Sequence, residues 1–148
     1  MPTFDDLDPL TFFGEDLSVS LRAVGWLGPE RPFNKGRVSP DVHQRLRELL
    51  TNPFQPFVSA GVHSCELCQF EGEKMGSVNL FVPDDGVLLV CPELILHYIN
   101  AHAYLPPQAF CIAVMACPDT RTTAYKRLFL ESGGRRLMRH VDQQRDRL

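Results

Sequence analysis

Two cysteines and two histidines in this sequence have the spacing of a metal site. A CxxC motif formed by Cys65 and Cys68 is followed, after 28 further residues, by His97 and His102 in an HxxxxH motif. Thiolate sulfur and imidazole nitrogen are the ligands that structural zinc takes in four-coordinate tetrahedral sites. The pattern therefore predicts one structural Zn²⁺ ion held by these four side chains.

The separation of the two histidines restricts how both can reach one ion. Residues of a regular helix turn by about 100° each, so positions five apart diverge by about 140°. We expect the helix to tighten or unwind near its end, with His102 at or just past its C-terminus, because Pro106 and Pro107 follow. His63, two residues before Cys65, is the rival fourth ligand if His102 points away.

Other interpretations of the same residues stay open. The CxxC motif could be buried without a metal, with the two histidines in the core or on the surface. A redox role for Cys65 and Cys68 is disfavoured, because the residues that follow are polar and turn-like and do not form the helix that would lower a thiol pKa.

A zinc-dependent hydrolase is the enzymatic alternative. A catalytic zinc keeps one position open for water, so Cys65, Cys68 and His97 would bind the ion. The bases available to such a site are Glu66, Glu93 and His63. The sequence has no HExxH, nucleophile-elbow, P-loop, GxGxxG or deaminase motif. No catalytic residue is predicted, and four available ligands favour a closed structural site.

The elements around these motifs predict an α+β fold. It would contain a small antiparallel sheet, three or four helices and a treble-clef-like module of CxxC motif, hairpin and helix at the centre. Alternating or β-branched runs predict strands over 17–27, 77–82 and 86–90, with a turn over 83–86 and an edge strand over 54–60.

Helix signals are clearest after Ser39, where Ser is a good N-cap and Pro40 suits the first helical position. Further helices are predicted to begin at Pro92 and to cover 108–116 and 122–130. We expect a loosely docked acidic arm (1–16), a single zinc-binding domain (17–131) and a basic C-terminal tail (132–148).

Length and composition indicate a soluble globular domain. The 148 residues are 44% hydrophobic and 22% charged, and no apolar run approaches the ~20 residues that span a bilayer. The start of the chain does not read as a secretory signal, so we expect a cytoplasmic protein without membrane association. Five cysteines make an odd count, which metal binding in a reducing compartment explains better than disulfides.

Charge is unevenly distributed along the chain. The net charge is −3, yet residues 121–148 hold eight Lys or Arg against three Asp or Glu. Such a tail could bind a partner, nucleic acid included, although a solvated helix face is the commoner explanation. Nucleic-acid binding is disfavoured because residues 1–120 are net acidic; an unknown protein partner and the oligomeric state are left open.

Four pieces of the chain resemble a group of uncharacterised bacterial proteins with the pattern GxHxCxxC…HYIxxHxYxPP. The pieces are residues 22–27 (RAVGWL), 61–68 (GVHSCELC), 79–83 (NLFVP) and 92–107 (PELILHYINAHAYLPP). The resemblance covers about residues 20–118 and includes all five candidate ligands. It implies the same metal site without choosing between His63 and His102, and it carries no activity across to this chain.

Overall fold

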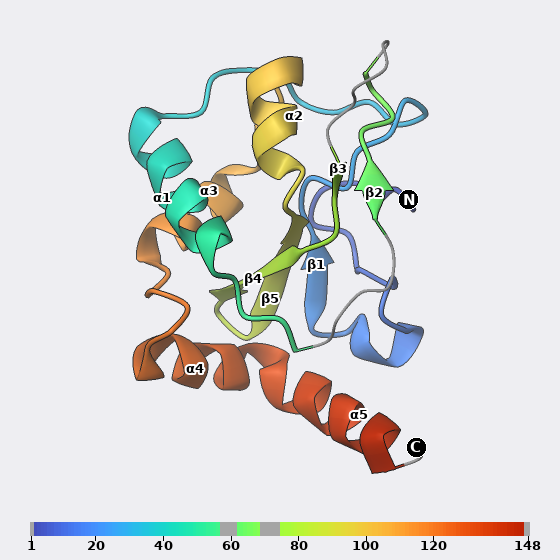
Figure 1. The fold of residues 1–148 in the computed structure, drawn as a ribbon, viewed down its shortest axis with the longest axis vertical. Coiled ribbons are helices and arrows are strands. Elements are labelled where there is room, and N and C mark those ends of the chain that lie inside the picture. Colours follow the sequence, from blue (N-terminus) through green and yellow to red (C-terminus); the bar gives the residue numbers. More distant parts are fainter. Residues whose placement is uncertain (1, 57–61, 69–74, 147–148) are drawn as a thin grey trace.

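A computed structural model describes residues 2–56, 62–68 and 75–146 of the chain (Figure 1). The elements, in chain order, are a 3₁₀ helix (Glu15–Leu17), β1 (Leu21–Ala23), α1 (Pro40–Thr51), β2 (His63–Ser64), β3 (Met75–Gly76), β4 (Asn79–Asp84), β5 (Val87–Pro92), α2 (Ile95–His102), α3 (Gln108–Ala116), α4 (Thr123–Phe129), a π-helical turn (Leu130–Gly134) and α5 (Arg135–Asp146). The predicted α+β class is confirmed.

The central sheet has three strands in the order β1-β5-β4. The predicted hairpin is present, since β4 and β5 pair antiparallel around Asp85 and Gly86, which both have positive φ angles (42° and 90°). The expectation of a purely antiparallel sheet is wrong, because β1 pairs in parallel with β5. The chain between these two strands contains α1 and is long enough for the crossover that parallel strands need.

The N-terminal segment is docked more closely than predicted. Backbone N–H groups of Leu7 and Leu10 donate to the carbonyl oxygens of Ala23 (2.7 Å) and Leu21 (3.1 Å), so the segment runs along the free edge of β1. The strand predicted over 17–27 is limited to three residues, because a 3₁₀ helix precedes it and the chain turns at Gly25, where φ is +75°.

The outer edge of β4 is also covered by hydrogen bonds. The side chain of Gln55 bonds both the N–H (3.4 Å) and the carbonyl oxygen of Asn79 (2.5 Å). The Tyr125 hydroxyl donates to the carbonyl oxygen of Phe81 (2.6 Å), and Pro83 has no N–H to offer. Phe54, Gln55 and Pro56 thus lie beside the sheet without forming the predicted edge strand, and the rest of that prediction falls outside the described residues.

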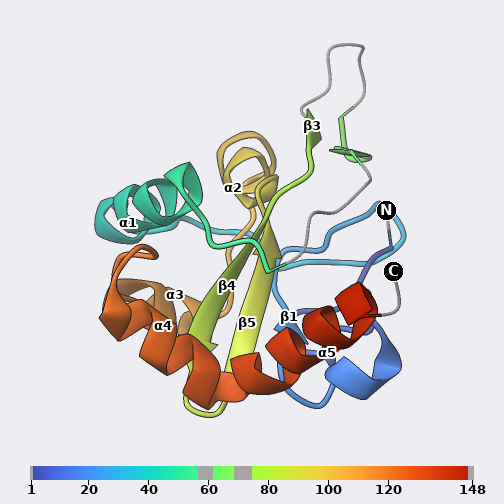
Figure 2. The ribbon, with the colours of Figure 1, turned by 60° about the horizontal axis from the view of Figure 1, so that its bottom comes forward.

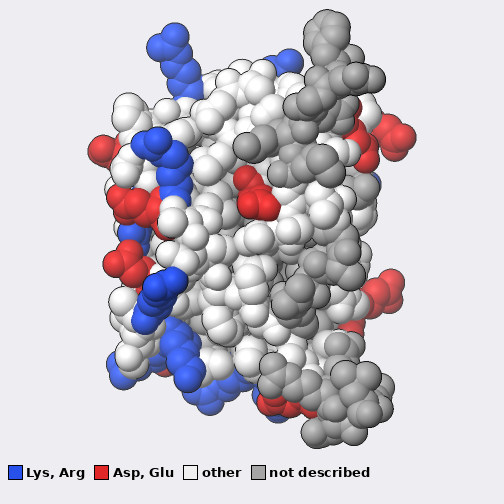
Figure 3. Space-filling view, viewed as in Figure 1, with Lys and Arg blue, Asp and Glu red and all other residues white. Residues whose placement is uncertain are grey.

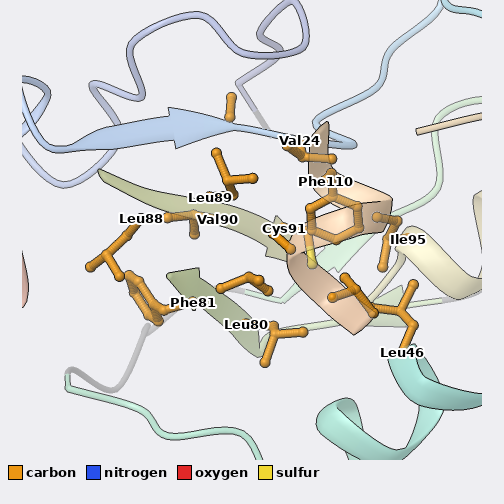
Figure 4. Packing of buried hydrophobic residues seen from close by; sticks show 14 of the residues in the cluster. Val24, Leu46, Leu80, Phe81, Leu88, Leu89, Val90, Cys91, Ile95 and Phe110 are labelled. Carbon is orange, nitrogen blue, oxygen red and sulfur yellow. The ribbon is translucent and has the colours of Figure 1, made fainter. Parts of the chain in front are cut away.

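The hydrophobic core lies on the central sheet and beneath the helices that cover it (Figure 2). Figure 4 shows Phe110 of α3 and Ile95 of α2 beside Cys91 of β5, with Leu46 of α1 approaching the same group. The Ser39 hydroxyl accepts from the Val42 N–H (3.3 Å), which confirms the predicted start of α1.

The helix predicted to open at Pro92 begins later, at Ile95. Pro92 is the last residue of β5, and the Glu93 carboxylate accepts backbone hydrogen bonds from Ser77 (2.6 Å) and Val78 (3.3 Å). This link occupies the N–H groups of the two residues before β4, so β4 also begins two residues later than predicted.

The C-terminal region consists of two helices at the lower end of the molecule in Figure 1. The Thr122 hydroxyl caps α4 by accepting from the Tyr125 N–H (3.2 Å), as the predicted boundary requires. The chain kinks at Ser132 and Gly133, where φ of Gly133 is +102°, and then continues as α5. In the described ranges, no helix is long and apolar enough to cross a membrane.

Asp6 links the N-terminal segment to the core, and its removal tests that link. Its carboxylate accepts from the Tyr104 hydroxyl (2.8 Å) and from the Gly25 N–H (2.9 Å). We expect Asp6→Ala to lower the free energy of unfolding by about 1–3 kcal/mol, because the buried Tyr104 hydroxyl loses its acceptor. Urea denaturation measures the change. Asp5→Ala is the control, since its exposed ion pair with Arg31 contributes about 0–1 kcal/mol.

The same carboxylate predicts a pH dependence. Burial raises the pKa of Asp6, against the lowering effect of its hydrogen bonds from Gly25 and Tyr104. Because the pKa of Asp6 is higher in the folded state than in the unfolded state, folding is favoured when Asp6 is protonated. This contribution to the free energy of unfolding is present in full at low pH and is lost as pH rises through the folded-state pKa. The Asp6→Asn variant should therefore gain stability relative to the wild type between about pH 3 and about pH 7. If the difference in free energy of unfolding between Asp6→Asn and the wild type stays constant across that range, the pKa of Asp6 is not raised.

Candidate metal centre

The Cys pair lies directly after β2, on a two-stranded arm that extends beside α2 (Figures 1 and 2). Cys65 and Cys68 flank a tight turn at Glu66 and Leu67. The backbone N–H groups of Leu67 and Cys68 form hydrogen bonds with the Cys65 sulfur. A CxxC turn of this kind brings both sulfurs to one side and directs N–H groups at a thiolate.

The two histidines come from opposite ends of α2. His97 lies in its first turn and His102 is its last residue. The N–H groups of Ala103 and Tyr104 both donate to the carbonyl oxygen of Tyr98, five and six residues earlier, and Ala103 is left-handed (φ 56°). The helix therefore unwinds immediately after His102, as the five-residue spacing of the histidines led us to expect.

The structure brings four of the five candidate ligands together. One nitrogen or sulfur atom from each of Cys65, Cys68, His97 and His102 lies within 4.8 Å of the others. His97 Nε2 is 3.2 Å from Cys68 Sγ, and His102 Nε2 is 3.4 Å from Cys65 Sγ and 3.6 Å from Cys68 Sγ. These separations suit ligands around one ion, since zinc binds sulfur at about 2.3 Å and nitrogen at about 2.0 Å.

His63, the rival ligand, lies outside this group. It is in β2, paired with Gly76 of β3, and its ring packs edge-on against Phe12 with 5.9 Å between ring centroids. Burial lowers the pKa of His63, with the N-terminal charge adding to the effect. Its Nε2 is buried and has no hydrogen-bond partner among the residues that the structure describes.

The cluster is partly shielded from solvent. Cys65 is fully buried, while the other three ligands are half-buried. Burial raises the pKa of the Cys65 thiol, and the Leu67 and Cys68 N–H groups oppose this effect. Two thiols next to two imidazoles in such a place form a donor set that could hold a metal ion.

Tyr98 is a neighbour of the cluster that was not among the candidate site residues. Its side chain is fully buried, and burial raises the pKa of its hydroxyl, with Cys65, Glu66 and Cys68 adding to the rise. The hydroxyl has no hydrogen-bond partner in the described part of the chain. Its position directly after His97 is the signal in the sequence that could have pointed to it.

The residues considered as bases, Glu66, Glu93 and His63, lie in different environments. The Glu93 carboxylate accepts the backbone hydrogen bonds of Ser77 and Val78. Glu66 is exposed at the tip of the CxxC turn. Burial raises the pKa of Cys91 far above its usual range, as expected for a cysteine that only fills the core.

Comparison with known proteins places the cluster inside a family domain. Residues 2–115, well over half of the chain, match the model described as Domain of unknown function (DUF7919). The chain belongs to this family. All four clustered residues and His63 fall within the matched region, whereas α4 and α5 lie beyond it. No curated protein and no solved structure matches the chain. The family description names no activity.

Proposed function

We propose that this protein is a zinc-binding module in which Cys65, Cys68, His97 and His102 hold one structural Zn²⁺. The observation that carries the proposal is the 4.8 Å grouping of four nitrogen and sulfur donors from two segments far apart in sequence. Two thiolates and two imidazoles are a donor set that closed structural zinc sites use. The pattern of the GxHxCxxC…HYIxxHxYxPP bacterial proteins includes these four positions, together with the rival ligand His63.

The role of the ion is to connect the β2–β3 arm to α2. The four residues occupy a turn and a helix, separated by the β4–β5 hairpin, in a treble-clef-like arrangement. Four protein ligands leave no position for a water molecule, which supports a structural ion over the hydrolase alternative. Reduced thiolates require a reducing compartment, so we place the protein in the cytoplasm, with a protein partner as the expected target of the module.

Zinc content and cobalt spectroscopy test the ligand set. We expect about one zinc per chain in the purified protein, because the site has four ligands for a single ion. Substituted Co²⁺ should give the intense visible absorption of tetrahedral coordination by two sulfurs and two nitrogens. His102→Ala should weaken zinc binding about tenfold or more and alter that spectrum.

His63→Ala is the matched control, since it removes an imidazole near the site but outside the cluster. It should leave the zinc content and the cobalt spectrum unchanged. Loss of zinc in His63→Ala but not in His102→Ala would replace the proposed fourth ligand with its rival. Wild-type protein without zinc that also fails to bind Co²⁺ would end the proposal.

A further inference from the structure

A second candidate binding site lies between α4, α5 and the segment that follows α1. It is a pocket of about 400 Å³, within the usual size range of small-molecule sites. None of its described lining residues belongs to the Cys/His cluster. Most of them come from residues 120–138, beyond the part of the chain that matches the family.

The floor of the pocket is aromatic and held in place. Phe129 packs edge-on against Phe54 (5.2 Å between centroids) and stacks with Tyr125 (6.1 Å). The Tyr125 hydroxyl is fixed by its 2.6 Å hydrogen bond to the backbone of β4. Met138 from α5 contributes a further apolar side chain to the lining. The floor is therefore preformed and suits a flat apolar ring, which prefers offset or edge-on aromatic neighbours.

Two cations, Arg121 and Lys126, also line the pocket. Arg121 donates to the neutral side chain of Asn52 (2.7 Å), and within the described ranges no carboxylate forms an ion pair with either cation. Asp119, the nearest acid in sequence, is instead bonded to Arg45 (2.8 Å). Figure 3 shows Lys and Arg side chains gathered along this lower end of the molecule. The pocket therefore combines an apolar floor with two cations that pair with no described carboxylate.

We propose that this pocket binds a small aromatic carboxylate. The ring lies against Phe54, Tyr125 and Phe129, and the carboxylate accepts hydrogen bonds from Arg121 and Lys126. Charged hydrogen bonds at the edge of an apolar pocket are stronger than neutral ones and fix the orientation of the ligand. Binding here is independent of the metal centre, so the two proposals can fail separately.

Methionine methyl NMR on the full chain, as purified, tests the proposal with 2-naphthoate as the probe. The Met138 ε-methyl lines the pocket and should shift in a saturable way, whereas the exposed Met115 methyl on α3 should not move. The neutral analogue 2-naphthamide should bind about tenfold more weakly, because it lacks the charge that the two cations recognise. No shift of Met138, equal shifts of both methyl groups, or equal affinity for the amide would overturn the proposal.

A pair of charge-matched variants isolates the two cations. The double variant Arg121→Gln, Lys126→Gln should weaken 2-naphthoate binding about fivefold or more. The control Arg127→Gln, Arg136→Gln removes the same charge from exposed positions on α4 and α5 that do not line the pocket. It should bind as the wild type does. If both double variants bind 2-naphthoate equally weakly, the ligand is attracted by net charge alone and the proposed site is wrong.

Discussion

Cys65→Ser is expected to destabilise this protein more than any other single substitution that preserves side-chain size. At the proposed zinc site, metal binding and folding are coupled, because the ligands are brought together only in the folded chain. The sheet and helices form a hydrophobic core of their own, so the centre of the variant should stay folded. We expect its free energy of unfolding to fall by about 3 kcal/mol or more. For a chain of this length that corresponds to a fall in Tm of about 10 °C.

Thermal unfolding followed by circular dichroism measures this effect, and a chelator provides the second arm. Excess chelator should lower the Tm of the wild type towards that of Cys65→Ser and leave the variant unchanged. Cys111→Ser is the matched control, because Cys111 is a half-buried cysteine outside the cluster and should shift Tm by little. A chelator effect of the same size on Cys65→Ser and the wild type contradicts a metal bound by this thiol.

Trp26→Ala is the second change with a large expected effect. Trp26 is fully buried, its ring packs against Phe4 (5.7 Å) and Phe12 (5.2 Å), and its Nε1–H donates to the Val90 carbonyl oxygen (2.9 Å). Truncating an aromatic residue in such a position costs about 3–5 kcal/mol. Urea denaturation should show this loss. Limited proteolysis should cut the variant earlier than the wild type near the N-terminus, because two of the ring's contacts come from that segment.

Trp26→Phe separates packing from hydrogen bonding. It keeps most of the apolar volume and loses only the Nε1–H donor. The Val90 oxygen keeps its hydrogen bond from the Val24 N–H (3.0 Å), so the variant leaves no buried acceptor without a donor. We therefore expect the lost hydrogen bond to lower the free energy of unfolding by about 1 kcal/mol, in addition to the effect of the smaller side chain. Equal destabilisation by Phe and Ala would mean that the ring contacts with Phe4 and Phe12 contribute nothing.

The elements that local sequence determines could be predicted. The Ser39 cap, the hairpin turn at Asp85 and Gly86 and the helix over 108–116 depend on neighbouring residues, and the structure has all three. The grouping of the two Cys and two His was also predictable, because metal-ligand spacing carries long-range information that composition does not.

The features that were missed depend on contacts between distant residues. The local sequence predicts Glu93 in the first turn of a helix. Its carboxylate instead accepts a hydrogen bond from the backbone before β4, and α2 begins only at Ile95. The parallel pairing of β1 with β5 joins strands more than 60 residues apart, so neither strand carries a local signal for it. Asp6 likewise gives no hint in sequence of its partner Tyr104.

The covered edges of the central sheet have a consequence for self-association. An exposed strand edge is a template for pairing with another chain and a route to aggregation. Here residues 4–10 occupy the edge of β1, while Gln55, Tyr125 and Pro83 leave few free backbone groups along β4. The central sheet therefore offers few backbone groups, among the described residues, at which a second copy could add a strand.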